Sequence, residues 1–183
     1  MHNSKIKKKI ITLIGPTACN KTSTAVHLIK KFPISIIGVD SVQIYKRFNI
    51  GSAKPPKEIL EKYKHHLVDS ADPENIFSVK DFYDQACRIV MQAHSNNRIP
   101  LLVGGTMMYF NALFKGINDI PEGNEAIREE LQRELDNRGV DKLFNELKEI
   151  DPESAKTIKK NDKQRIMRAL EVFKISGKKI SDF

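Results

Sequence analysis

The chain has 183 residues, of which 40% are hydrophobic and 30% are charged, and its formal net charge is +8. This length accommodates one α/β domain, or one domain with a small insertion, and no apolar run is long enough to span a membrane. The two cysteines, Cys19 and Cys87, are too few for a disulfide framework or a metal site, so we expect a cytoplasmic protein with no membrane partner.

An apolar stretch at residues 10–14 leads directly into the run Gly15-Pro-Thr-Ala-Cys-Asn-Lys-Thr22. A strand, a tight loop and a helix start form a P-loop, G-x-x-x-x-G-K-[ST], here with Asn20 at the second glycine. Backbone amides and the helix dipole would hold phosphate oxygens, Lys21 would add a positive charge, and Thr22 would offer a hydroxyl to Mg²⁺. Because asparagine tolerates left-handed geometry, we expect Asn20 to keep the loop shape and to crowd the phosphates. The alternative is an ordinary strand–turn–helix junction.

Strand and helix patterns alternate over the first two thirds of the chain. No small-residue cleavage site follows the basic N-terminus, so its apolar continuation is interpreted as a strand rather than a signal peptide. The expected elements are strands at 9–14, 34–40, 65–69 and 99–104, and helices at 21–32, at 78–97 and after the glycine turn at 104–106. Apolar strands between amphipathic helices indicate a buried parallel sheet. The predicted fold class is therefore α/β, with a P-loop-type parallel sheet core over residues 1–116.

The strand pattern ends at about residue 117. Helical patterns follow at 124–138, 141–149, 152–159 and 162–176. The last has an apolar stripe, Asp162 as its N-cap and Gly177 as its stop. The stripe comprises Ile166, Ala169, Leu170 and Phe173. We therefore expect a helical insertion module over residues 117–183.

Charge is distributed unevenly along the chain. Residues 119–153 carry five basic and twelve acidic residues, whereas residues 156–179 carry nine basic and two acidic residues. A basic segment beside an acidic one suggests a local patch for polyanions. The alternative is a solvated helical face.

Polar residues follow the predicted core strands. Asp40 ends the second strand and Thr106 follows the fourth, so both should open onto the same crevice as the P-loop. Asp40 is a candidate general base, or an acceptor that orients an amine, unless it simply makes a turn with Ser41. Asp69 is a weaker candidate, as an acid that holds magnesium through water.

The start of the last predicted helix carries Gln164, Arg165 and Arg168. Gln164 and Arg168 are four residues apart and share a face. An arginine there is able to clamp nucleic-acid phosphates or stack on a base. The alternative is ordinary pairing with Asp162 and Glu171.

Six segments in this order resemble a known family. They are GPTACNKT from residue 15, VDSVQIY from 39, IGSAKP from 50, HHLVD from 65, LLVGGTMMY from 101 and NDKQRIMRALE from 161. The series resembles the tRNA dimethylallyltransferase, or tRNA isopentenyltransferase, family from about residue 9 to the end of the chain. Asn20 departs from the family's glycine. Family members also continue past residue 183, so the resemblance implies that the last core strand is missing and that the sheet ends at 99–104 with an exposed apolar edge.

The resemblance implies a reaction. A dimethylallyl group passes from dimethylallyl diphosphate to N6 of the adenosine 3′ to the anticodon of tRNA, and diphosphate is released. Asp40 would accept a hydrogen bond from N6 and act as the base, Thr106 would lie beside that amine and the diphosphate, and Thr22 would help hold Mg²⁺. The diphosphate would contact Gly15, Pro16, Thr17, Ala18, Cys19, Asn20, Lys21 and Thr22.

The resemblance also implies contacts with the tRNA anticodon arm. They would come from Asp40, Ser41, Val42, Gln43, Thr106, Arg128, Gln164, Arg165, Ile166, Met167 and Arg168. The helical module would grip the anticodon arm, the target adenosine would leave its stack, and we expect a monomer.

Three hypotheses follow from the sequence. The first is a dimethylallyltransferase or its N-terminal part. The second is a nucleotide or small-molecule kinase with the same P-loop core, although no arginine-rich lid motif is present. The third is a truncated, inactive remnant that retains weak tRNA affinity through its basic segments.

Overall fold

The computed structural model describes residues 9–183, and the basic segment before them lies outside the described residues. The chain divides into two compact units, the first ending at Ile117 and the second running from Asn118 to Phe183. The expected boundary after residue 116 lies one residue away from this division.

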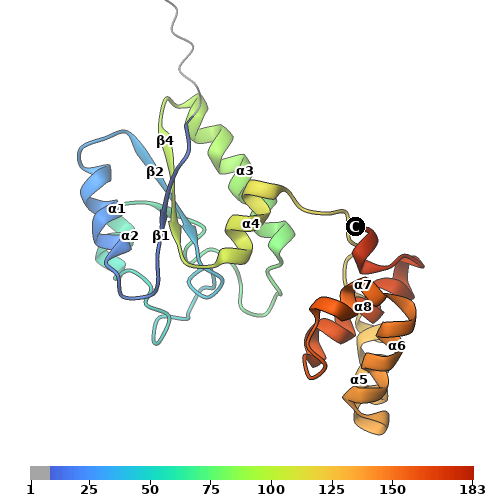
Figure 1. Ribbon diagram of the computed structural model, residues 1–183. Helices are drawn as coiled ribbons and strands as arrows, with labels where there is room; N and C mark the ends of the chain where they lie inside the picture. Colours follow the sequence, from blue (N-terminus) through green and yellow to red (C-terminus); the bar gives the residue numbers. More distant parts are fainter. Residues whose placement is uncertain (1–8) are drawn as a thin grey trace, which may run out of the picture. The chain divides into compact units, whose positions relative to one another are not determined.

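A parallel sheet forms the centre of the first unit (Figure 1). Its strands are β1 (Ile11–Ile14), β2 (Ile34–Val39), β3 (His65–His66) and β4 (Ile99–Gly104), in the order β1-β4-β2-β3. Its helices are α1 (Lys21–Ile29), α2 (Lys57–Lys62), α3 (Val79–Ser95) and α4 (Met107–Lys115). The α/β fold class with a parallel sheet is confirmed.

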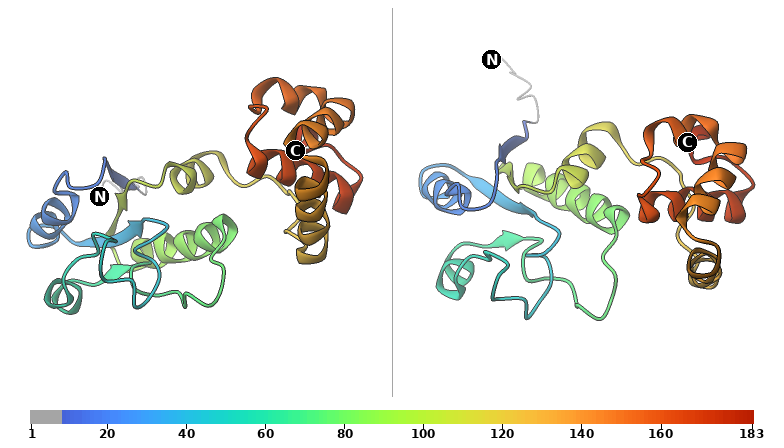
Figure 2. Two further views of the ribbon diagram at one scale, coloured as in Figure 1. Left: turned by 90° about the horizontal axis from the view of Figure 1, so that it is seen from below. Right: turned by 60° about the horizontal axis from the view of Figure 1, so that its bottom comes forward.

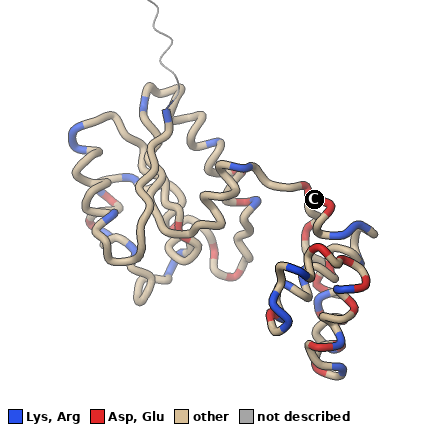
Figure 3. Tube along the Cα trace, viewed as in Figure 1, with Lys and Arg blue, Asp and Glu red and all other residues tan. Residues whose placement is uncertain are grey.

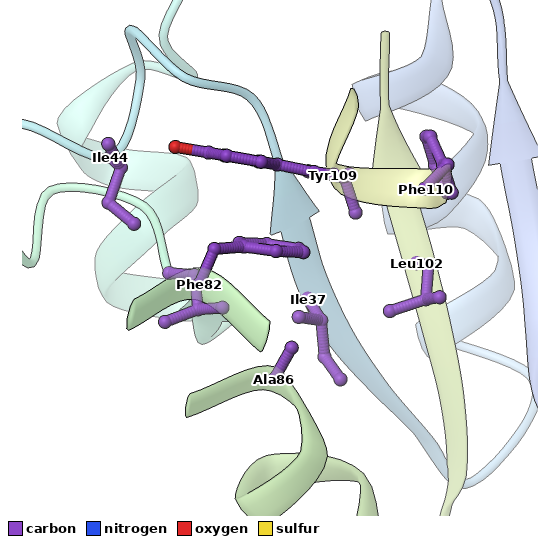
Figure 4. Close-up of a cluster of buried hydrophobic side chains, with 9 residues drawn as sticks. Ile37, Ile44, Phe82, Ala86, Leu102, Tyr109 and Phe110 are labelled. Atoms are coloured by element: carbon purple, nitrogen blue, oxygen red, sulfur yellow. The ribbon is translucent and has the colours of Figure 1, made fainter. Parts of the chain in front are cut away.

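Helices cover both faces of the sheet. Helix α1 packs on one face, and α3 with α4 pack on the other (Figures 1 and 2). All six residues of β2 are buried, as a strand covered on both faces requires. On the α3 face, the rings of Phe82 and Tyr109 stack at 4.1 Å between centroids, above Ile37 and Leu102 (Figure 4).

The expectation that the sheet ends at 99–104 is wrong. Strand β4 pairs with β1 through Ile11–Leu101 and with β2 through Ile36–Leu101, so it lies inside the described sheet. The edge strand next to β4 is β1, where Ile11 and Ile14 are 43% and 44% exposed. The apolar pattern identified β4 as a strand but gave no information about its neighbours. Strands β1 and β2 follow each other in the chain but are not adjacent in the sheet, and β4 occupies the position between them.

The second unit is entirely helical in the described chain. It contains α5 (Glu125–Arg138), α6 (Val140–Ile150), α7 (Pro152–Thr157), α8 (Lys163–Ser176) and a short 3₁₀ helix, η1 (Ile180–Asp182). Asp162 caps α8 by accepting a hydrogen bond from the Arg165 amide at 3.1 Å, and Gly177 ends it at a φ of 68°. Both predicted helix ends are confirmed.

Acidic and basic residues alternate over the second unit (Figure 3). It carries 14 Lys and Arg against 15 Asp and Glu, a net charge of −1, so the first unit carries the remaining +9. Within it, Lys174 of α8 pairs with Glu130 of α5 at 2.8 Å, and Lys160, between α7 and α8, pairs with Asp141 of α6 at 3.0 Å. The acidic and basic segments of the sequence therefore largely balance each other in space.

Candidate active site

The P-loop joins β1 to α1 and has two left-handed residues. Ala18 has a φ of 66°, and Asn20, the N-cap of α1, has φ 59° and ψ 24°. The expectation that Asn20 retains the loop shape is confirmed for its backbone. Its side chain makes no capping hydrogen bond, and the first turn of α1 contains no acidic residue. The helix N-terminus therefore keeps its unpaired amides and its partial positive charge for an anion.

Lys21 lies folded over the loop. Its Nζ donates hydrogen bonds to the carbonyl oxygens of Gly15, at 2.8 Å, and of Pro16, and it lies 3.6 Å from Cys19 Sγ. A Cβ on Gly15 would stand 2.7 Å from that sulfur, so the loop is too tight there for a larger residue. The ammonium group is therefore held at the loop by carbonyl oxygens, which phosphate oxygens can replace.

A pocket of about 440 Å³ opens over this loop. It is lined by Thr17, Ala18, Cys19, Asn20, Lys21, Thr22, Ser23, Val26, Asp40, Gln43, Ala53, Ile59, Val103 and Gly104. The structure thus brings Asp40 and Gln43 to the same pocket as six residues of the P-loop. Ile59 belongs to α2, which the sequence analysis missed because a six-residue helix is too short to show a helical period.

The ends of β2 and β4 are tied together beside the pocket. The Thr106 hydroxyl oxygen accepts a hydrogen bond from the Ser41 amide at 3.0 Å. The amides of Gly105 and Thr106 both donate to the Val39 carbonyl at 3.2 Å. A Cβ on Gly104 would stand 2.0 Å from that carbonyl oxygen, so only glycine allows the two strand ends to approach this closely.

Asp40 makes the turn that the sequence analysis considered. Its Oδ1 accepts hydrogen bonds from the amides of Val42, at 2.9 Å, and Gln43, at 3.1 Å. Among the described residues its Oδ2 has no hydrogen-bond donor, and Asp40 lines the pocket. Turn formation therefore fixes the carboxylate while leaving one oxygen for a ligand. Val42 itself is 46% exposed and contributes no lining atom.

Lys54 braces the loop that carries Gln43. Its side chain is only 4% exposed, and its Nζ donates to the Tyr45 carbonyl and to Asp69 Oδ1, both at 2.7 Å. Gln43 Nε2 in turn donates to the carbonyl oxygens of residues 52 and 53. Asp69 is therefore the ion-pair partner of Lys54. It does not line the pocket, and the structure does not support it as a magnesium ligand. Sequence reasoning gave Lys54 no role.

The second unit contains the remaining predicted site residues. Arg165 pairs with Asp162 at 3.1 Å and Arg168 pairs with Glu171 at 2.6 Å, as the alternative reading expected. Ile166 is fully buried in the helical core, so its side chain packs there and offers no surface to RNA. Met167 is half-buried against the same core, and Gln164 is exposed.

The sequence of the chain matches the model of one known protein family. Residues 43–183 match the model of the IPP transferase family. The chain belongs to this family. It is 46% identical over 178 residues to the tRNA dimethylallyltransferase of Vesicomyosocius okutanii, a match that covers 97% of this chain and 58% of that protein.

Solved structures of the family resemble the chain as well. The tRNA isopentenylpyrophosphate transferase of Bacillus halodurans is 40% identical with a TM-score of 0.58, over 93% of this chain and 57% of that one. A eukaryotic dimethylallyltransferase described as acting on tRNA is 29% identical with a TM-score of 0.80, over 96% of this chain and 44% of that one. The chain thus spans about half the length of these relatives. The comparisons give no support to the kinase alternative.

Two features are absent from the described residues. No helix among them has the length and apolar character that a membrane crossing requires. Residues 9–183 contain no group of three or more His, Cys, Asp or Glu side chains arranged to hold a metal ion.

Proposed function

We propose that this chain carries the diphosphate-binding and RNA-binding parts of a tRNA dimethylallyltransferase. The observation that supports this most is the pocket, in which a P-loop and the single carboxylate of Asp40 face the same space. The names of the relatives specify a dimethylallyl group and tRNA, and the P-loop favours dimethylallyl diphosphate as the donor.

In this proposal the loop holds the leaving group. The amides at the start of α1 and the ammonium group of Lys21 bind the diphosphate and stabilise the negative charge that develops as the C–O bond to the dimethylallyl group breaks. Val26, Ile59 and Val103 give the same pocket an apolar side that suits a five-carbon chain. The pocket therefore offers charge to one end of the substrate and apolar surface to the other.

Asp40 acts on the adenine. Its Oδ2 accepts a hydrogen bond from N6 and takes the N6 proton as the new C–N bond forms. Thr106 holds the Ser41 amide, and thereby the turn that orients Asp40. Removing the proton from N6 keeps the product neutral at the amine, so the step balances with diphosphate as the leaving group.

The pocket residues also fit Mg²⁺. The ion prefers oxygen ligands and is commonly held by one or two protein groups together with substrate phosphates. Within residues 9–183 the Thr22 hydroxyl makes no hydrogen bond, and Asp40 adds a carboxylate at the same pocket. Thr22 would hold the ion together with the diphosphate oxygens, and the ion would neutralise diphosphate charge, which leaves Asp40 Oδ2 for the adenine.

The proposal is tested by label transfer. Labelled dimethylallyl diphosphate, Mg²⁺ and an anticodon stem-loop with the target adenosine are mixed with the chain, and label in RNA is measured. We expect transfer that Asp40→Asn reduces by at least about a hundredfold, the usual range for general base catalysis. Asp84→Asn, an exposed position on α3, is the matched control and should retain wild-type transfer.

Other outcomes decide among the alternatives. A folded chain that binds dimethylallyl diphosphate but transfers no label would be the inactive remnant. A chain that binds neither dimethylallyl diphosphate nor the stem-loop would overturn the proposal. Phosphoryl transfer from ATP, with no prenyl transfer, would return the kinase reading.

A further inference from the structure

A buried carboxylate organises the start of the helical unit. Glu171 on α8 is 2% exposed, and its Oε1 accepts hydrogen bonds from Arg128 Nε at 2.8 Å and from the Asn124 amide at 2.9 Å. Its Oε2 accepts a hydrogen bond from Arg168 Nη1 at 2.6 Å. One acid thus joins two of the arginines that the family resemblance assigns to tRNA.

The two arginines use this carboxylate differently. Arg168 spends both Nη groups on protein acceptors, because its Nη2 donates to the Pro121 carbonyl at 2.7 Å. Arg128 spends only Nε, and its Nη groups have no hydrogen-bond acceptor among residues 9–183. The Arg128 side chain is 50% exposed, against 33% for Arg168. Arg168 therefore ties the segment before α5, at Pro121, to α8, whereas Arg128 keeps both of its Nη groups available at the surface.

Gly123 completes the arrangement. A Cβ built on it would stand 1.8 Å from Arg128 Nη2 and 2.4 Å from Cζ, so the guanidinium plane lies directly on the glycine. The carboxylate of Glu171 holds the guanidinium in this position, which the absence of a side chain at residue 123 permits. A fixed fork of two N–H donors matches the geometry of a phosphate.

The net charge of the second unit makes the position of the Arg128 guanidinium important for RNA binding. With a net charge of −1, the second unit does not attract RNA through its total charge, so its affinity must come from individually placed cations. We propose that Glu171 is a positioning residue for RNA binding, which holds Arg128 so that its Nη groups clamp a backbone phosphate. This inference rests on the proposed tRNA-binding function.

Two substitutions test the role of Glu171, because simple electrostatics and positioning predict opposite results. Glu171→Gln removes a negative charge beside two arginines, which by charge alone would tighten binding to any RNA. If Glu171 positions Arg128, the same variant weakens binding. Gly123→Ala displaces the Arg128 guanidinium without changing any charge, and because it moves only the end of a flexible side chain on an exposed segment, it leaves the fold intact.

The measurement is fluorescence anisotropy of a labelled anticodon stem-loop, titrated with the full chain at several salt concentrations. We expect Arg128→Gln, Glu171→Gln and Gly123→Ala each to weaken binding roughly five- to tenfold, and each to lower the slope of log K against log salt by about 0.7 to 0.9. Glu149→Gln is the matched charge control, since Glu149 is exposed on α6 and forms no ion pair with a described residue. It should bind as tightly as the wild type or slightly more tightly.

The outcomes separate this inference from the proposed function. If Arg128→Gln weakens binding while Glu171→Gln and Gly123→Ala bind like the wild type or better, the positioning role is overturned and the RNA-binding function stands. If the wild-type chain does not bind the stem-loop, the RNA-binding function and this inference both fall. If Glu171→Gln loses its helical circular dichroism, Gly123→Ala decides the question alone.

Discussion

The left-handed backbone at Asn20 is testable by two substitutions at one position. Asn20 has φ 59° and ψ 24°. In most residues other than glycine this backbone geometry brings Cβ close to the following carbonyl oxygen, which costs about 1–2 kcal/mol. The Asn20 side chain is exposed and makes no capping hydrogen bond, so its replacement acts mainly through the backbone. We expect Asn20→Ala to lower the free energy of unfolding of the first unit by about 1 kcal/mol. Asn20→Gly should change it by less than about 0.5 kcal/mol, because glycine adopts this geometry freely but loses more chain entropy on folding.

The assay can be restricted to the first unit. All four tyrosines of the chain lie before residue 117, and the chain has no tryptophan, so tyrosine fluorescence during urea unfolding reports on that unit alone. Calorimetric titration with inorganic diphosphate and Mg²⁺ completes the test. Asn20→Gly should bind diphosphate at least as tightly as the wild type, and Asn20→Ala more weakly. An alanine variant as stable as the wild type would refute the view that Asn20 is there to supply left-handed geometry.

Three further predictions concern stability. Gly104→Ala should abolish cooperative unfolding of the first unit by tyrosine fluorescence, because its Cβ would collide with the Val39 carbonyl 2.0 Å away. Asp151→Asn should destabilise the second unit by roughly 2 kcal/mol in a circular dichroism melt, since the buried carboxylate accepts four hydrogen bonds from two serines. Burial alone would raise the pKa of Asp151, but those bonds hold it below its ordinary value, so the stabilisation is present above about pH 4 and is lost as the pH falls through the lowered pKa. Burial lowers the pKa of His65, so the first unit should lose stability as the pH falls below about 6.5, and a His65→Gln variant should lose less over the same range in urea midpoints.

The sequence predicted what depends on local pattern. Strands β2 and β4 appear within one residue of their expected ends, because continuous apolar runs bounded by turns are a strong signal. The caps Asp162 and Gly177 were equally predictable, since each acts on its own helix. The position of Asp40 and the P-loop at one pocket followed from the rule that the carboxyl ends of parallel strands share an edge.

Features that depend on distant partners could not be predicted. The place of β4 between β1 and β2 depends on pairing with strands far away in the chain, and the close approach to Val39 at its end needs Gly104, and no local pattern shows either feature. Lys54 reads as an exposed loop lysine in the sequence, yet it is buried because Asp69 and the Tyr45 carbonyl converge on it from another part of the chain.

The arginines of the second unit show that pairing and RNA binding need not exclude each other. The sequence analysis treated an ion pair with Glu171 as the alternative to a role in binding. A guanidinium group, however, has five N–H donors, and one hydrogen bond from Arg128 Nε fixes its plane while leaving four. In the proposed RNA-binding role, the pairing that would have argued against function reduces the side-chain entropy that Arg128 loses when it binds a phosphate. For Arg168, whose two Nη groups are both engaged, the same argument favours a structural role. Which donors an ion pair consumes, rather than whether the pair exists, therefore decides what each arginine can still bind.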